Sequence, residues 1–166
     1  GSERSSWEVL KRGVPQGSVV GPLLFNLFLN DMFYTITNVD IYNYADDNSL
    51  SFHHEDPQVL RSVLEKSSEM AITWFTRNMM KANPGKFQAI SMCRDQNKLI
   101  DKFHIAGNDI MAQESVKLLG ITIDKDLSFD LHIPNLCRKS SRQVRALRRI
   151  ASSINMESRV QVLNSY

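Results

Sequence analysis

Cysteine is scarce in this chain, and long apolar runs are absent. Cys93 and Cys137 are the only 2 cysteines, and neither has a second cysteine or a histidine at zinc-finger spacing. These features argue against a disulfide framework and against a structural zinc site. The most apolar run, residues 22–33, is interrupted by three polar residues and falls short of the roughly twenty residues that span a bilayer. The cysteine usage fits a reducing intracellular setting. No membrane anchor or signal peptide is visible in the sequence.

An excess of charge of one sign is missing as well. The formal net charge is +2 and the pI is about 8.6, so the average charge neither requires nor excludes a nucleic-acid partner. With 166 residues, of which 42% are hydrophobic, the chain is long enough for one domain with a core. It opens with Gly1-Ser2 rather than with methionine, which we interpret as a cloning scar or an excised fragment.

Apolar residues at helical spacing predict three helical regions. The first is a buried helix from about Val19 to Tyr34, with Pro22 in its first turn, where proline is tolerated. Its expected buried stripe is Leu23, Leu24, Leu27, Phe28 and Met32. The second begins at Asp56 as N-cap, runs to about Met80 and is stopped by Asn83-Pro84-Gly85. Trp74 lies on its apolar stripe and is expected in the core. The third begins near Asp130.

Short strands are predicted between and after these helices. They are Ile41–Tyr44, Ser49–His53, Phe87–Cys93, Lys102–Ile105, Asp109–Ala112 and Val116–Ile123. The order of helices and strands predicts an α+β fold with a small antiparallel sheet.

The adjacent acids Asp46 and Asp47 lie between two short strands, which predicts a tight hairpin with both carboxylates at its tip. Asn48 is a candidate for the positive φ that such turns require. Adjacent carboxylates repel each other unless a divalent cation compensates, and Mg²⁺ is commonly held by one or two carboxylates plus substrate phosphates. Taken alone, the pair is more typical of a solvated turn. The preceding Tyr44-Ala45 and the apolar flanking strands reverse this and favour the metal.

A glycine-containing loop, Pro15-Gln16-Gly17-Ser18, precedes the first predicted helix. Free N–H groups at the start of a helix and a close backbone approach at glycine suit contact with a phosphate or a base. The amide of Gln16 can both donate and accept hydrogen bonds. An ordinary loop with a helix cap is the alternative, and this loop by itself does not decide between the two.

A row of arginines marks the last predicted helix, with apolar residues on the opposite face. The arginines are Arg138, Arg142, Arg145 and Arg149. Arginines along one helix face can follow a phosphate backbone without regard to base sequence. The alternative is a solvated face whose long side chains cover apolar surface. The absence of acidic residues between the first and last arginine favours nucleic acid.

Two stretches, Arg12–Phe25 and Tyr44-Ala45-Asp46-Asp47, resemble the reverse transcriptases of non-LTR retrotransposons, the LINE-like elements of the jockey and CR1 kind. The resemblance covers nearly the whole chain and continues through Trp74, Asn78, Asn83–Phe87, Leu118–Asp124 and His132-Ile133. Group II intron and retron reverse transcriptases share the two cores but differ around Ser18 and Pro22, so they are less similar.

The resemblance implies a polymerase palm over residues 1–125, without the fingers and the first palm motif, and the beginning of a helical thumb over residues 126–166. It implies that Asp46 ligates catalytic Mg²⁺ and that Asp47 supports the metals or the primer end. Lys86 matches a region placed near the leaving pyrophosphate, although a solvated turn lysine is an equal alternative. The implied template and nucleotide pocket consists of Pro15, Gln16, Gly17, Tyr44 and Ala45. The implied primer grip is Leu119-Gly120, and the four arginines are the implied contacts to the nucleic-acid backbone.

By this resemblance the parent enzyme uses two Mg²⁺ ions, an RNA template, a DNA primer and deoxynucleotide triphosphates, in the cytoplasm and nucleus and without a membrane. The first metal-binding Asp of the family is expected before residue 1. We therefore expect the isolated chain to bind Mg²⁺ weakly or not at all and to be inactive. The alternative is a noncatalytic RNA-binding or scaffold module derived from a reverse transcriptase. The oligomeric state is not predicted.

Overall fold

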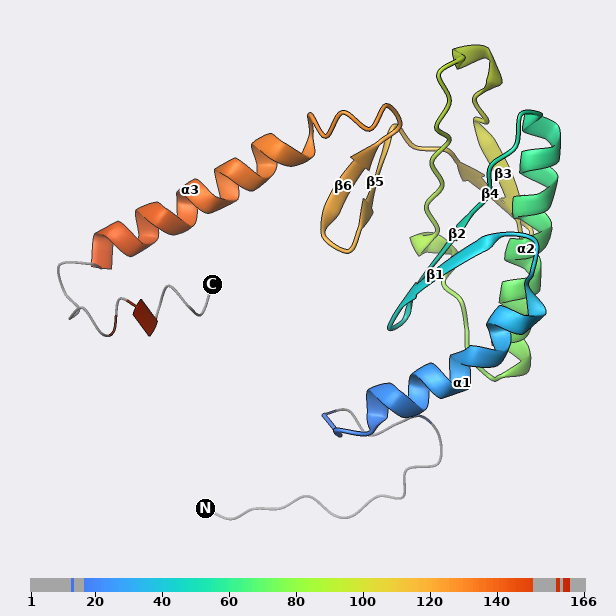
Figure 1. The fold of residues 1–166 in the computed structure, drawn as a ribbon, viewed down its shortest axis with the longest axis horizontal. Coiled ribbons are helices and arrows are strands. Elements are labelled where there is room, and N and C mark those ends of the chain that lie inside the picture. The colour runs from blue at the N-terminus through green and yellow to red at the C-terminus, as the bar shows by residue number, and fades with distance from the viewer. Residues whose placement is uncertain (1–12, 14–16, 151–157, 159, 162–166) are drawn as a thin grey trace. The chain divides into compact units, whose positions relative to one another are not determined.

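The structure is a computed structural model that describes residues 13, 17–150, 158, 160 and 161 (Figure 1). The elements in chain order are α1 (Gly21–Thr35), β1 (Asp40–Tyr44), β2 (Asp47–Ser51), α2 (Pro57–Arg77), the 3₁₀ turns η1 (Pro84–Lys86) and η2 (Gln96–Lys98), β3 (Lys102–Ile105), β4 (Asn108–Met111), β5 (Ser115–Leu118), β6 (Ile121–Asp124) and α3 (His132–Ile150). Helices are thus combined with antiparallel strands, which confirms the predicted α+β class.

The chain divides into two compact units. The first contains the described residues up to Phe87 together with Lys102–Met111, and the second contains Gln88–Asp101 with the described residues from Ala112 onward. The predicted division into palm and thumb after residue 125 stays a prediction. None of the described helices is both long enough and apolar enough to cross a membrane.

The core of the first unit lies where α1 packs on α2. Its buried side chains are Leu29, Met32, Ile36, Ala71 and Trp74. Leu29 and Met32 come from one side of α1, Ile36 is the C-cap residue that follows this helix, and the other two come from α2. The Trp74 ring is 7% exposed, so the prediction that this residue belongs to the core is confirmed.

The prediction that α1 is a buried helix is only partly right. Leu23 and Leu27, which we expected in the buried stripe, are 60% and 64% exposed, whereas Met32 is buried. The reason is that α1 packs on α2 through the Leu29–Met32 side of its C-terminal half. Periodicity identified an apolar helix, but it did not show which apolar side chains meet a partner.

Helix α2 begins as predicted and ends earlier than predicted. The Asp56 carboxylate accepts a hydrogen bond from the backbone N–H of Gln58 at 2.8 Å, which is an N-cap. At the other end Met79 adopts a φ of 57°, and the N–H of Met80 donates to the carbonyl of Phe75 at 2.9 Å. This is the Schellman arrangement, with methionine at a position that glycine usually occupies. The helix therefore stops before the Asn83-Pro84-Gly85 segment.

The strands of the described residues form three separate two-stranded antiparallel hairpins, not the single small sheet that we predicted. The predicted strand 116–123 is itself a hairpin, since Leu118 pairs with Ile121 across a turn. The predicted strand 87–93 makes only one bridge, Ala89 to Ala112. Its other bonds are single contacts, such as the Ser91 hydroxyl accepting from the N–H of Ile100 at 3.1 Å, so no continuous ladder forms.

Candidate functional site

The two acids lie at the tip of the β1–β2 hairpin, as predicted. Tyr44 pairs with Asp47, which leaves Ala45 and Asp46 as a two-residue turn (Figure 1). Ala45 has a φ of 52°, and a positive φ at the first turn residue alone is typical of a type II′ turn. Asp46 occupies the turn and Asp47 opens β2, and both side chains are exposed. Tyr44, 67% exposed, directly faces Asp47 across the hairpin.

Asn48 does not supply the positive φ that we predicted for it. It is a β2 residue that pairs with Asn43 on β1, and the Asn43 side-chain amide donates to the Asn48 side-chain oxygen at 2.9 Å. The same amide donates to the carbonyl of Ala45 at 3.0 Å, and the Asn48 amide donates to the carbonyl of Asp46 at 3.3 Å. These bonds hold both turn carbonyls, so the asparagine pair fixes the turn from which Asp46 projects.

The glycine-containing loop is described only in part. Pro15 and Gln16 lie outside the described residues, so their predicted roles stay predictions. Gly17 has a φ of 81°, a conformation in which glycine carries no steric penalty. The Ser18 hydroxyl accepts from the backbone N–H of Gly21 at 2.8 Å and so satisfies one N–H at the start of α1.

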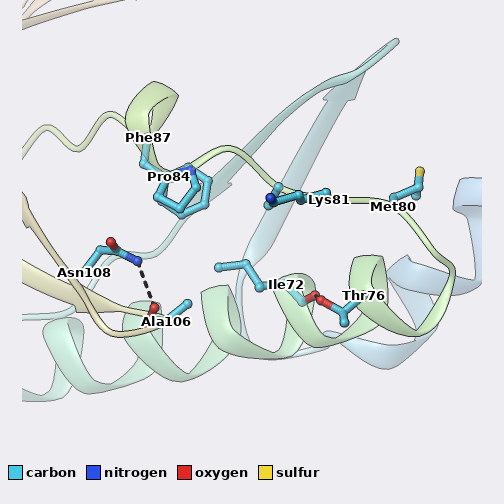
Figure 2. Close-up of a pocket in the computed structure, with 9 residues that line it drawn as sticks. Ile72, Thr76, Met80, Lys81, Pro84, Phe87, Ala106 and Asn108 are labelled. Carbon is cyan, nitrogen blue, oxygen red and sulfur yellow. Dashed lines mark hydrogen bonds between the residues drawn. The ribbon is translucent and has the colours of Figure 1, made fainter.

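Lys86 is an exposed residue of η1, whose first turn is capped by the Asn83 side chain accepting from the N–H of Gly85 at 3.1 Å. A cavity of about 250 Å³ lies in the same unit, between α2, the segment that follows it and the β3–β4 turn (Figure 2). Its lining is mostly apolar: Ile72, Thr76, Met80, Lys81, Ala82, Pro84, Phe87, Ala106 and Asn108. None of the predicted catalytic side chains is among these residues, so the candidate chemistry belongs to the hairpin tip.

A charged cluster covers the β3–β4 hairpin of the same unit. His104 and Asp109 face each other across the strands, and the His104 Nδ1 lies 2.9 Å from the Asp109 carboxylate. Lys102 donates to the other carboxylate oxygen at 3.0 Å. The hydrogen bond with His104 lowers the pKa of Asp109 from its ordinary value, and the hydrogen bond and positive charge of Lys102 lower it further. All three side chains are more than half exposed, so this cluster is a surface network.

In the second unit, the predicted primer grip is the turn of the β5–β6 hairpin. Leu119 and Gly120 have φ values of 48° and 87°, and a positive φ at both turn residues is typical of a type I′ turn. Leu119 is 55% exposed. The turn therefore presents an apolar side chain and bare backbone to solvent, which suits contact with a sugar or a base edge.

Helix α3 carries the predicted arginine face. Arg138, Arg142, Arg145 and Arg149 are all exposed, and their spacing places them on one side of the helix. We expected the opposite, apolar side to be buried, but Ile133 and Leu136 are 55% and 52% exposed. In the part of the chain that the structure describes, α3 is anchored near its start, where the ring of His132, its first residue, accepts a hydrogen bond from β6.

Comparison with protein families aligns residues 2–123 with the family described as reverse transcriptase (RNA-dependent DNA polymerase). The chain belongs to this family. The reverse transcriptase of the jockey mobile element of Drosophila melanogaster, named as an RNA-directed DNA polymerase, is 29% identical over 140 residues, or 80% of this chain and 15% of the relative. The protein of the same name from Drosophila funebris is 31% identical over 146 residues, or 80% of this chain and 15% of the relative. The probable RNA-directed DNA polymerase from transposon BS is 29% identical over 150 residues, or 84% and 16%.

These relatives confirm the resemblance to reverse transcriptases of LINE-like, jockey-type retrotransposons. The chain spans about 15% of the length of the jockey relatives. No solved structure shows a significant match to the chain.

Reverse transcriptases depend on divalent metal ions, and the donor set at the hairpin tip fits such an ion in part. Asp46 and Asp47 offer hard carboxylate oxygens on an exposed turn, and Mg²⁺ in proteins is usually bound by one or two carboxylates, with water and substrate phosphates completing its shell. Among the residues that the structure describes, no group of three or more His, Cys, Asp or Glu side chains lies close enough together to hold a metal.

Sequence reasoning missed the roles that four residues have in this reverse transcriptase chain. Asn43 and Asn48 flank the turn symmetrically, so they could have been found once the two-residue turn was assigned. Asp124 and His132 anchor the segment between β6 and α3 through backbone groups. Both residues lie in stretches that carry the family resemblance, but their roles were not predicted, because their partners depend on the path of an irregular loop.

Proposed function

We propose that the protein to which these residues belong synthesises DNA on an RNA template. The observation that carries the proposal is the position of the Tyr44-Ala45-Asp46-Asp47 sequence, at the tip of a two-residue hairpin in a member of the reverse transcriptase family. In the proposed reaction the primer 3′ hydroxyl attacks the α-phosphate of a deoxynucleotide triphosphate. A new P–O bond forms, and the bond to pyrophosphate breaks.

The side chains of this chain would position the reactants. Asp46 and Asp47 would hold Mg²⁺, which when bound neutralises the charge that develops on the phosphates. Gln16 and Gly17 would line the template and nucleotide pocket with Pro15, Tyr44 and Ala45. In this proposal Lys86 lies near the departing pyrophosphate and Leu119-Gly120 contacts the primer.

The 166-residue chain alone is proposed to be inactive. A two-metal site needs a further carboxylate beside the adjacent pair, and the described residues bring no third metal-binding side chain to it. In this proposal residues 1–125 are the C-terminal part of a palm and residues 126–166 begin a thumb, and the fingers and the first palm motif would be supplied by a longer protein.

Primer extension on an RNA template tests both statements. The chain alone is compared with a longer protein of the same element that carries the preceding polymerase segment, each with Asp46 and with Asp46→Asn. Asp31→Asn, an exposed aspartate on α1, is the matched control. We expect extension by the longer protein only, lost with Asp46→Asn and kept with Asp31→Asn. Synthesis by the longer protein that survives Asp46→Asn contradicts the assigned function. Extension by the chain alone that needs Asp46 contradicts the proposed inactivity.

A second candidate function, noncatalytic RNA binding, is favoured by the exposed arginine face of α3. Binding of this kind depends on phosphates and not on the hairpin acids. It should therefore persist in EDTA and in a chain with Asp46→Asn and Asp47→Asn. If chelation or these substitutions abolish RNA binding, the noncatalytic candidate is rejected.

A further inference from the structure

The segment between β6 and α3, residues 125–131, is held at both of its ends by side chains that bind backbone groups. Asp124, the last residue of β6, is only 9% exposed. Its carboxylate accepts hydrogen bonds from the N–H groups of Asp126 at 3.2 Å, Ser128 at 2.8 Å and Phe129 at 2.7 Å. One buried carboxylate thus organises most of this loop.

The backbone of the loop explains why it needs that carboxylate. Leu127 and Phe129 have φ values of 55° and 60°, a region that residues other than glycine rarely adopt. Such conformations persist where surrounding contacts over-determine them, and the bonds to Asp124 do so here. Phe129 then passes the constraint on, because its carbonyl accepts from the N–H groups of His132 and Ile133, each at 3.0 Å, at the start of α3.

A second, independent connection comes from His132, the first residue of α3. Its Nδ1 accepts a hydrogen bond from the backbone N–H of Thr122 at 3.3 Å. Leu118 and Ile121 close the hairpin turn, so the next pair, Lys117 and Thr122, is the non-hydrogen-bonded kind, and the Thr122 N–H points away from β5. The His132 ring therefore satisfies an edge N–H of β6 and ties the helix to the strand.

We propose that Asp124 and His132 are positioning residues that fix the direction in which α3 leaves the β5–β6 hairpin, so that the Leu119-Gly120 turn and the arginine face of α3 bind one primer–template duplex together. The proposal rests on the proposed polymerase function. Two sites on a rigid connection act at a high effective concentration toward a shared ligand, and a loosened connection removes that gain. The Lys125–Glu114 ion pair, at 2.8 Å, braces the same end of the hairpin.

The direct test measures, without nucleic acid, how rigid the joint between β6 and α3 is, where the joint means residues 125–131 with Asp124 and His132. Spin labels are placed on Cys137 of α3, which is exposed, and on Lys117→Cys of β5, in a Cys93→Ser background. Pulsed electron–electron double resonance should give a narrow distribution of the distance between the two labels for the parent chain and a broad one for His132→Leu and Asp124→Ala. His132→Asn should restore the narrow distribution, because its side-chain oxygen replaces the Nδ1 acceptor.

Matched controls and a second variant separate the joint from general instability. His104→Leu and Asp109→Ala remove a His–Asp contact in the first unit and should leave the distribution narrow. Thr122→Pro removes the donor of the hydrogen bond to His132 and replaces His132→Leu in the test if that variant fails to fold. It should spare the hairpin, because the Thr122 N–H lies outside the β5–β6 ladder. A broad distribution in the parent chain, or no broadening in any joint variant, overturns the proposal.

Binding of a short RNA–DNA hybrid with a recessed 3′ end supplies the functional readout. His132→Leu should weaken binding about tenfold with unchanged helix content by circular dichroism, and His132→Asn should recover most of the loss. Equal affinity for the parent chain and His132→Leu overturns the positioning role. The parent chain could fail to bind the hybrid while the distance distributions behave as expected. That result rejects the proposed nucleic-acid function, and with it the role of the joint in duplex binding, but not the rigid connection itself.

Discussion

Replacing the four α3 arginines, Arg138, Arg142, Arg145 and Arg149, by glutamine should remove most of the salt dependence of nucleic-acid binding. Helix α3 rises about 1.5 Å per residue, so the arginine row is about 16 Å long. One strand of a duplex carries a phosphate about every 3.4 Å of axis, so the row passes about five phosphates and can neutralise four. Glutamine keeps a similar helix propensity and a polar side chain while it removes the charge.

The size of the effect follows from counterion release. Four neutralised phosphates contribute about −3.6 to the slope of log affinity against log salt concentration. Raising the salt from 50 to 200 mM should then weaken binding by the unsubstituted chain by about 150-fold through these contacts alone, and the fourfold variant should lose this part of the dependence. Fluorescence anisotropy with a labelled RNA–DNA hybrid over that salt range measures both slopes.

A charge-matched control decides whether position or net charge matters. Four exposed cations outside α3 are replaced by glutamine in the control: Lys66, Arg77, Arg94 and Lys98. Both variants have the same net charge, but only the α3 variant should flatten the slope. If the control flattens it equally, or if the slope of the α3 variant changes by less than about one, the arginine face is not the binding surface.

Two further predictions concern the loops that the structure singles out. Ala45→Gly should stabilise the first unit by about 0.5–1 kcal/mol in urea unfolding, because relief of the left-handed conformation, about 1–2 kcal/mol, exceeds the backbone entropy cost of glycine, about 0.5–1 kcal/mol; a loss of stability would show that Ala45 is not strained. Asp124→Asn should lower the melting temperature at neutral pH. The hydrogen bond from the N–H of Ser128 lowers the pKa of Asp124 in the folded chain. Burial opposes this effect, and the hydrogen bond from the N–H of Phe129 adds to it. Because the pKa is lower in the folded chain, the ionised carboxylate stabilises the fold at pH values above the ordinary carboxyl pKa. This stabilisation is lost as the pH falls through the folded pKa, so the difference between the melting temperatures of the parent chain and Asp124→Asn should narrow below about pH 4. A difference that stays constant from pH 7 to that range would contradict the assignment.

The candidate site was largely predictable where its geometry is local. The hairpin at Asp46-Asp47, the Asp56 cap and the arginine spacing each depend on residues a few positions apart, and each is found where the pattern put it. The Met79 C-cap is local too, but methionine in a left-handed conformation carries no sequence signal, so the end of α2 was misplaced. The assignment of positive φ to Asn48 failed because Ala45 takes that conformation instead.

The sequence by itself determined the family, the position of the twin acids and the amphipathic character of the last helix, because motif spacing and helical periodicity are properties of neighbouring residues. Only the tertiary structure decided which side of α1 is buried, how Asn43 and Asn48 hold the turn, and how Asp124 and His132 connect β6 to α3. Those features depend on side chains that reach backbone groups or partners elsewhere in the fold, and such partners are set by the path of the folded chain.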